Sequence, residues 1–133
     1  MVLMGCSTQP VDFPPGERAC EHCKMSIVDL KFHTQAISKR GKIYPFDSIE
    51  CMILWNAEHP DIETEMWFKN YLDPGVWMKM ENAKIIRSHL IHSPMGSNLL
   101  AISIQESESS IPEGAEVDKV KLLSYIKSLK ISQ

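Results

Sequence analysis

The chain has 133 residues, of which 44% are apolar and 23% charged, and its formal net charge is −3 with a pI of about 5.9. This length predicts one compact domain that buries a core without disulfide staples. No run of lysine and arginine interleaves with aromatic residues, which argues against a nucleic-acid surface. No apolar run approaches the roughly 18 residues that a membrane-spanning helix requires.

The first 18 residues are predicted to hold a lipid attachment site and a flexible tether. The stretch Leu3-Met4-Gly5-Cys6 resembles the end of a bacterial lipoprotein signal, in which an apolar and a small residue precede the lipidated cysteine. It predicts lipidation at Cys6 and a periplasmic protein anchored to the membrane; a cysteine without lipid is the alternative. Residues 7–18 are rich in proline and predict the tether, and residues 19–133 are predicted to form a single domain.

Two thiols and a thioether follow within six residues, at Cys20, Cys23 and Met25. Soft sulfur donors select Cu(I) over Mg²⁺, Ca²⁺ or Mn²⁺. A neutral thioether is a poor ligand for zinc, whose protein sites use cysteine, histidine and carboxylates. The pattern therefore predicts a Cu(I) site. Met95, which a proline and a glycine flank in a predicted loop, is a further candidate ligand that the fold could bring back to this cluster.

Other chemistries also use a Cys-x-x-Cys pair. A zinc site could combine Cys20 and Cys23 with His89 and His92, which form the close histidine pair of the sequence. A redox dithiol would follow a strand at a helix N-terminus, whereas a proline-rich segment stands here. Covalent haem attachment needs a histidine where Lys24 stands. If the two cysteines bind no metal, they contribute only packing or a local disulfide.

A β-hairpin is predicted over residues 32–46, because two apolar stretches flank a turn that contains glycine. A helix is then predicted with Asp47 as its N-cap and Glu50 as its capping-box partner. It is expected to end at His59-Pro60, since the residue before proline avoids the helical region. Cys51 lies in the apolar run of this helix and is predicted to be a small buried hydrophobic residue.

The second half predicts further strands over residues 66–71, 77–78, 85–87 and 99–104, with a turn at Asp73-Pro74-Gly75 and a short helix over residues 80–84. Apolar residues recur every three positions from Val117 to Ile126, which predicts a closing helix over residues 115–130. This alternation without regular crossovers is typical of an α+β fold with small mixed or antiparallel sheets.

Several motifs occur in an order that resembles the NosL family, copper-binding lipoproteins that serve the assembly of nitrous oxide reductase. The resemblance covers roughly residues 6–104. It rests on Cys20-x-x-Cys23-x-Met25-x-Ile27, Lys42-Ile43-Tyr44-x-Phe46-Asp47, Asp73 before Trp77, Ala83, and Ser93-Pro94-Met95-Gly96. It implies a fold of two small ββαβ-type units, a topology also seen in organomercurial lyases; the helix over residues 115–130 lies outside the match.

The resemblance also implies a function and a ligand set. Cys23, Met25 and Met95 match the family's copper ligands, and Cys20 matches its first cysteine, which could be a ligand, a resolving thiol or a spectator. Members bind Cu(I) outside the cytoplasm and deliver it through a maturation complex. The chain departs from the common pattern at Lys24, where glycine is frequent, and at Asp47, where a cysteine is common. The recipient could therefore be nitrous oxide reductase or another apo copper enzyme.

The sequence contains no nucleophile elbow, phosphate-binding loop or recognisable pair of catalytic acids. We therefore predict a Cu(I)-delivering protein that is not an enzyme. The alternative function is a structural zinc-binding or metal-sensing module built on the Cys-x-x-Cys pair.

Overall fold

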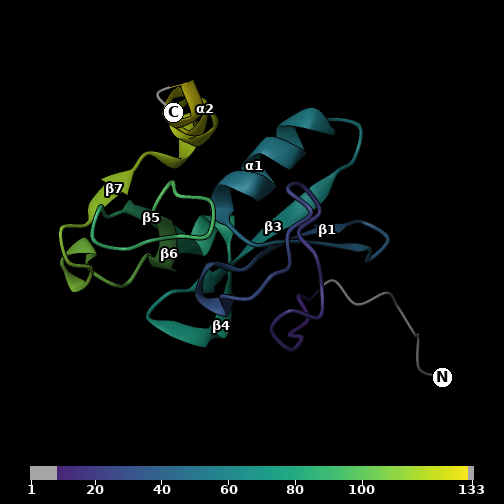
Figure 1. Ribbon diagram of the computed structural model, residues 1–133, viewed down its shortest axis with the longest axis horizontal. Coiled ribbons are helices and arrows are strands. Elements are labelled where there is room, and N and C mark those ends of the chain that lie inside the picture. The colour runs from purple at the N-terminus through teal and green to yellow at the C-terminus, as the bar shows by residue number, and fades with distance from the viewer. Residues whose placement is uncertain (1–8, 132–133) are drawn as a thin grey trace.

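The computed structural model describes residues 9–131 and shows two antiparallel sheets with two α-helices (Figure 1). This confirms the predicted α+β class and the presence of a C-terminal helix. The strands and α-helices, in chain order, are β1 (Thr34–Ser38), β2 (Ile43–Phe46), α1 (Ile49–Glu58), β3 (Thr64–Asn70), β4 (Asp73–Lys79), β5 (Ala83–Arg87), β6 (Leu99–Ser103), β7 (Ala115–Val117) and α2 (Leu122–Ile131). Short 3₁₀ helices span Leu30–Phe32, Met80–Asn82, Glu108–Ser110 and Lys119–Lys121. None of the helices found between residues 9 and 131 is long and apolar enough to cross a membrane.

The first sheet has the strand order β2-β1-β3-β4, and the second has the order β6-β5-β7. The predicted hairpin is confirmed, because β1 and β2 pair with Ala36 opposite Tyr44. Helix α1 contacts both of these strands, so the first half reads ββαβ and is extended by β4. In the second half α2 follows the three strands and contacts α1.

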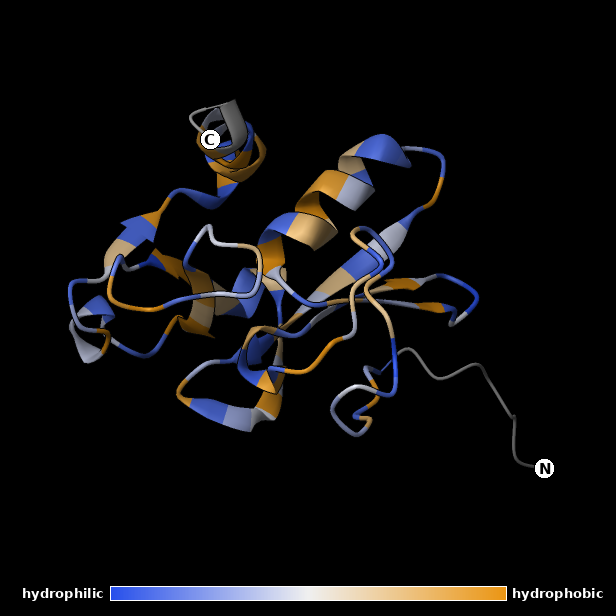
Figure 2. Cartoon of the chain, viewed as in Figure 1, coloured by the Kyte–Doolittle hydropathy of each residue, from blue (hydrophilic) through white to orange (hydrophobic). Residues whose placement is uncertain are grey.

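The main core packs around α1, with large side chains at most 1% exposed that include Phe46, Ile49, Met52 and Phe68. A smaller cluster surrounds Ile86, Leu100 and Ile102 in the second sheet. Figure 2 shows apolar residues on α1 and along the strands of the second sheet. Cys20, Ile27 and Cys51 belong to the main core, so the loop that precedes β1 is a packed part of the domain.

The turn predicted at Asp73-Pro74-Gly75 is wrong by two residues. The Asn70 side-chain oxygen accepts a hydrogen bond from the Leu72 backbone N–H at 3.0 Å, which closes the connection between β3 and β4 as an Asx turn. Asp73 therefore already pairs with Asn70 in the ladder. The following proline stands at the start of an edge strand, where its missing N–H breaks no ladder bond.

The helix predicted over residues 115–130 is wrong at its start. Residues Ala115–Val117 form β7, which pairs with β5. Asp118 then caps a 3₁₀ turn by accepting from the Val120 N–H. Val120, whose position suggested the apolar face of a helix, is 92% exposed. The free edge of β5 is a long-range partner that helical periodicity does not reveal, so α2 begins only at Leu122.

The described part of the predicted tether is bound to the first sheet. The Gln35 side chain exchanges two hydrogen bonds with the backbone of Val11, at 3.1 and 2.7 Å. The Asp12 carboxylate accepts a hydrogen bond from Lys69 Nζ at 2.6 Å. From Val11 onward the segment is therefore held against β1 and β3, and it leads directly into the cysteine-containing loop. Cys6, the predicted lipidation site, lies outside the described residues.

Helix α1 is confirmed, but its N-cap is Ser48 and the prediction of Asp47 is wrong by one residue. Ser48 is extended, with φ −155° and ψ 165°, and its Oγ accepts from the Cys51 N–H at 3.2 Å. The predicted capping-box partner, Glu50, accepts instead from the Ser97 N–H of a distant loop. Because Ser48 caps the helix, the Asp47 side chain is available to face the loop before β1.

Replacing Ser48 with alanine is expected to lower the free energy of unfolding by about 1 kcal/mol, the usual cost of losing an N-cap hydrogen bond. Urea unfolding of the metal-free protein measures this difference. Asp47→Asn is the matched control at the neighbouring position, and it should leave the helix cap intact. Unchanged stability in Ser48→Ala would contradict its role as the cap.

Candidate metal centre

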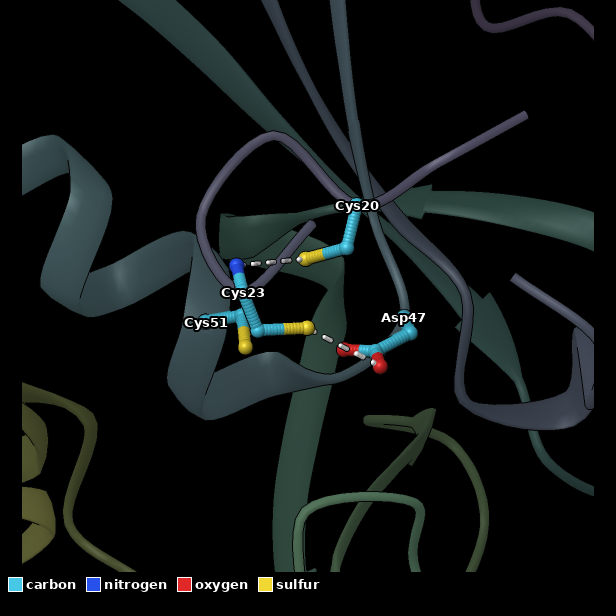
Figure 3. A group of neighbouring side chains, drawn as sticks. All are labelled: Cys20, Cys23, Asp47 and Cys51. Carbon is cyan, nitrogen blue, oxygen red and sulfur yellow. Dashed lines mark hydrogen bonds between the residues drawn. The ribbon is translucent and has the colours of Figure 1, made fainter. Parts of the chain in front are cut away.

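Four potential ligands meet at the N-terminus of α1 (Figure 3). Cys20 and Cys23 come from the loop before β1, Asp47 follows β2, and Cys51 lies in the first turn of the helix. Their three sulfur atoms and one carboxylate oxygen all lie within 4.8 Å of one another. Cys20, Asp47 and Cys51 are buried, whereas Cys23 is half-buried. This set could bind a metal ion, and Cys23 is its most exposed member.

Backbone hydrogen bonds fold the loop so that both of its thiols face α1. The Cys20 N–H donates to the Met25 carbonyl at 2.8 Å, and the Lys24 N–H donates to the Cys20 carbonyl at 2.9 Å. The Cys23 N–H lies 3.5 Å from Cys20 Sγ and donates to it. Lys24 has φ +68°, in the left-handed region that glycine adopts at lower cost. A glycine at this position would relieve this strain.

Asp47 adds a negative group to the thiols. Its Oδ2 accepts from the Cys23 thiol at 3.4 Å, and its Oδ1 is buried without a hydrogen-bond partner. A buried polar atom without a partner is costly. A cation placed among the sulfurs would offset this cost. The residues present are therefore suited to hold a metal ion.

The three thiols differ in acidity. The hydrogen bond from the Cys51 thiol lowers the pKa of Cys20 to about 6, against the opposing effect of burial. Burial raises the pKa of Cys23 to about 11, and the hydrogen bond to Cys20 raises the pKa of Cys51. Cys20 is therefore the first of the three thiols to lose its proton as the pH rises. Metal binding would release the remaining protons, because the thiolate is the metal ligand.

Of the two predicted methionine ligands, Met25 shares a pocket with Asp47 of the cluster, and Met95 follows Pro94, which borders the same pocket. Met25 is 60% exposed and lines a pocket of about 250 Å³ together with Asp47 and Pro94. Met95 is half-buried and packs against the main core, which contains Cys20 and Cys51. The Pro94–Gly96 turn is therefore on the same side of the protein as the cysteine cluster.

The alternative zinc site with two histidines is not assembled. His92 lines the pocket beside Met25, whereas His89 lies in a different pocket with Arg87 and Tyr125. Among residues 9–131, neither histidine belongs to the group of ligands around Cys20. His89 lies two residues after the end of β5, whereas His92 lies in the following loop, beside Ser93 and Pro94 in the pocket that Met25 borders.

Two members of the cluster, Asp47 and Cys51, were missed by the sequence reasoning, which interpreted them as a helix cap and a buried hydrophobic residue. Their four-residue separation at a predicted helix start was the available signal, since it places both side chains beside one helical turn. No protein-family model matches the chain, and no curated protein is similar to it in sequence. The candidate metal centre therefore stands on its geometry.

Proposed function

We propose that the protein binds one Cu(I) ion at this centre and delivers it, outside the cytoplasm, to a copper enzyme or to the complex that matures one. The supporting observation is the meeting of Cys20, Cys23 and Cys51 with Asp47 within 4.8 Å. The resemblance of the sequence to the NosL family agrees with this proposal, as does the lipoprotein-like stretch that ends at Cys6.

The ligand chemistry favours Cu(I) as the cargo. Thiolates and thioethers are soft ligands that select Cu(I) over hard cations. Three thiols lie inside the centre, and Met25 borders a pocket that Asp47 of the centre also borders. Zinc sites use thiolates as well but seldom a thioether, so a contribution of Met25 to the bound ion would separate the two metals.

The arrangement suits transfer more than permanent storage. Cys20 and Cys51 are at most 1% exposed and would hold the ion from inside. Cys23 is half-buried and Met25 is 60% exposed. A sulfur or imidazole ligand of a recipient can approach from this side and bind the ion before the last cysteine leaves. The ion then moves by ligand exchange and is never free in solution.

Zinc in a structural role is the second candidate, and Asp47 is the observation that favours it. Three thiolates and a carboxylate complete the four-coordinate set that structural zinc requires. The carboxylate is a hard ligand that Cu(I) does not need. In this alternative the ion stabilises the junction between the cysteine loop and α1 and is not passed on.

The test is a competition between the two metals. Reduced, metal-free protein is titrated with Cu(I) in the presence of bicinchoninate and, separately, with Zn²⁺ in the presence of a zinc dye. We expect one Cu(I) per chain and displacement of bound Zn²⁺ by Cu(I). The rate of Cu(I) transfer to a chelator should rise with chelator concentration, because the acceptor takes part in the exchange. Zinc that resists displacement by Cu(I) would favour the structural role, and no binding of either metal would refute both.

A further inference from the structure

Glu50 is a buried carboxylate on α1 whose position the metal centre does not explain. It is 4% exposed and directly precedes Cys51. Its Oε2 accepts a hydrogen bond from the Ser97 backbone N–H at 3.2 Å, and its Oε1 is buried without a partner. Glutamate is almost never fully buried unless it is paired. The contact with Ser97 is therefore the best indication of what this side chain does.

The segment that contains Ser97 is a closed loop. Ser93 and Asn98 clamp its two ends, because Ser93 Oγ accepts from the Asn98 N–H at 2.9 Å and Asn98 Oδ1 accepts from the Ser93 N–H at 3.3 Å. Gly96 and Asn98 have φ values of +84° and +61°, which bend the chain back on itself. Residues 93–98 are thus a preformed unit that can keep its shape when its contact with α1 is lost.

This loop is rooted in the second sheet and meets α1 through Glu50. On one side Arg87 Nε donates to the Ser97 carbonyl at 3.2 Å, and the Ser88 N–H donates to the Asn98 carbonyl at the same distance. On the other side the Ser97 N–H donates to Glu50. Of the hydrogen bonds found between residues 9 and 131, this one joins the loop to the helix that carries Cys51.

The loop also borders a pocket that reaches Asp47 of the metal centre. Ser93 and Pro94 line the same pocket as Met25 and Asp47. Met95, at the tip of the loop, packs against the core that contains the buried cysteines. If the loop moved away from α1, it would widen this pocket at Asp47 and so give access to the centre from this side.

We infer that Glu50 is a positioning residue that holds the loop of residues 93–98 against α1 and thereby slows the exit of a metal ion from the centre. This inference rests on the proposed metal-binding function. It assigns to Glu50 a role in the kinetics of exchange, distinct from the roles of the ligands. The capping-box role predicted from sequence gave Glu50 a contact with its own helix only.

The experiment compares three replacements of Glu50. Glu50→Ala removes the acceptor and should free the loop. Glu50→Gln keeps a carbonyl oxygen at the same reach and should preserve the wild-type behaviour. Glu50→Asp keeps the charge but shortens the side chain, and it provides a second loosened variant if the alanine variant does not fold. Glu63→Ala, a change at an exposed residue paired with Lys39, is the surface control.

Two quantities are measured for each variant. Amide hydrogen exchange at Ser97, followed in the reduced, metal-free protein, reports the loop contact. The rate of Cu(I) release to bathocuproine disulfonate at a fixed concentration reports the exit of the ion. In Glu50→Ala we expect both rates to rise by about tenfold, the factor that corresponds to the loss of one hydrogen bond. Glu50→Gln and Glu63→Ala should stay close to wild type.

The outcomes separate this inference from the proposed function. Wild-type release of Cu(I) from Glu50→Ala, together with fast exchange at Ser97, would overturn the inference and leave the proposed function standing. Equal acceleration in Glu50→Gln and Glu50→Ala would also overturn it. The two rates would then depend on the loss of the carboxylate and not on the hydrogen bond to Ser97. Absence of Cu(I) binding by the wild-type protein would remove the proposed function and this inference with it.

Discussion

Replacing Cys51 with serine is expected to abolish stoichiometric Cu(I) binding. The Cys51 sulfur lies within 4.8 Å of the sulfurs of Cys20 and Cys23, and the residue is 1% exposed, so the serine hydroxyl would occupy the same buried place. A serine hydroxyl is a hard donor and a poor ligand for Cu(I). The loss of affinity should exceed the roughly 10- to 100-fold that removal of an outer-shell partner costs, and competition with bicinchoninate measures it.

The matched control is Met52→Leu. Met52 is the next residue of α1 and is fully buried in the same core, and this volume-conserving change usually costs less than about 1.5 kcal/mol of stability. If Met52→Leu lost Cu(I) as Cys51→Ser does, general loosening of the helix would be the cause. Far-ultraviolet circular dichroism confirms that both variants are folded before the titration.

This experiment also decides between two ligand sets. The sequence predicts Cys20, Cys23, Met25 and Met95 as candidate ligands, whereas the structure groups Cys20 and Cys23 with Cys51 and Asp47. The structural set predicts that Met25→Leu and Met95→Leu keep one Cu(I) per chain with weaker binding or faster exchange. Retention of Cu(I) by Cys51→Ser, together with its loss in Met95→Leu, would show that the set predicted from sequence is correct.

Local rules were sufficient for the first half of the fold. The hairpin of β1 and β2 and the helix α1 follow from apolar runs, a glycine-containing turn and a proline after the helix, all within about 30 residues. The strand β7 could not be predicted in this way, because it exists only through pairing with β5, some 30 residues earlier. Its three residues continue the apolar spacing of the following helix, and that spacing predicted a helix there.

In the candidate site, too, some residues could be recognised from local sequence and others could not. Cys20, Cys23 and Met25 are close in sequence, so their chemistry could be recognised from spacing alone. Asp47 and Cys51 each had an adequate local explanation, and local explanations compete with functional ones when only the sequence is known. The structure shows that Ser48 caps the helix, so the Asp47 side chain contacts the cysteine loop instead. A shift of one residue in a cap thus decided whether the carboxylate belonged to the helix or to the metal centre.

Acid is expected to destabilise the protein through His33, which is 1% exposed and directly precedes β1. Burial lowers the pKa of His33 to about 3, and the positive charge of Lys69 acts in the same direction. The geometry requires the neutral ring, because Gln35 Nε2 already donates to the Val11 carbonyl and lies 3.3 Å from His33 Nε2. The ring nitrogen accepts from this amide; a protonated ring would set two donors against each other.

The sign of the pH effect follows from the two pKa values. In the unfolded chain histidine binds a proton below about pH 6.5, whereas His33 in the folded protein stays neutral down to about pH 3. The unfolded state therefore binds more protons between these limits, and stability falls as the pH falls. Between pH 7 and pH 4 the expected loss from this group is about 3 kcal/mol, at about 1.4 kcal/mol per pH unit.

Urea unfolding of the reduced, metal-free protein at pH 7 and pH 4 measures this loss. His33→Gln removes the titrating group, so its stability should fall by about 3 kcal/mol less than that of the wild type over this interval, whatever its stability at pH 7. His89→Gln replaces an exposed histidine and should keep the wild-type pH dependence. Identical pH dependence in His33→Gln and the wild type would show that His33 is protonated in the folded protein, and the neutral ring required by Gln35 would then be wrong.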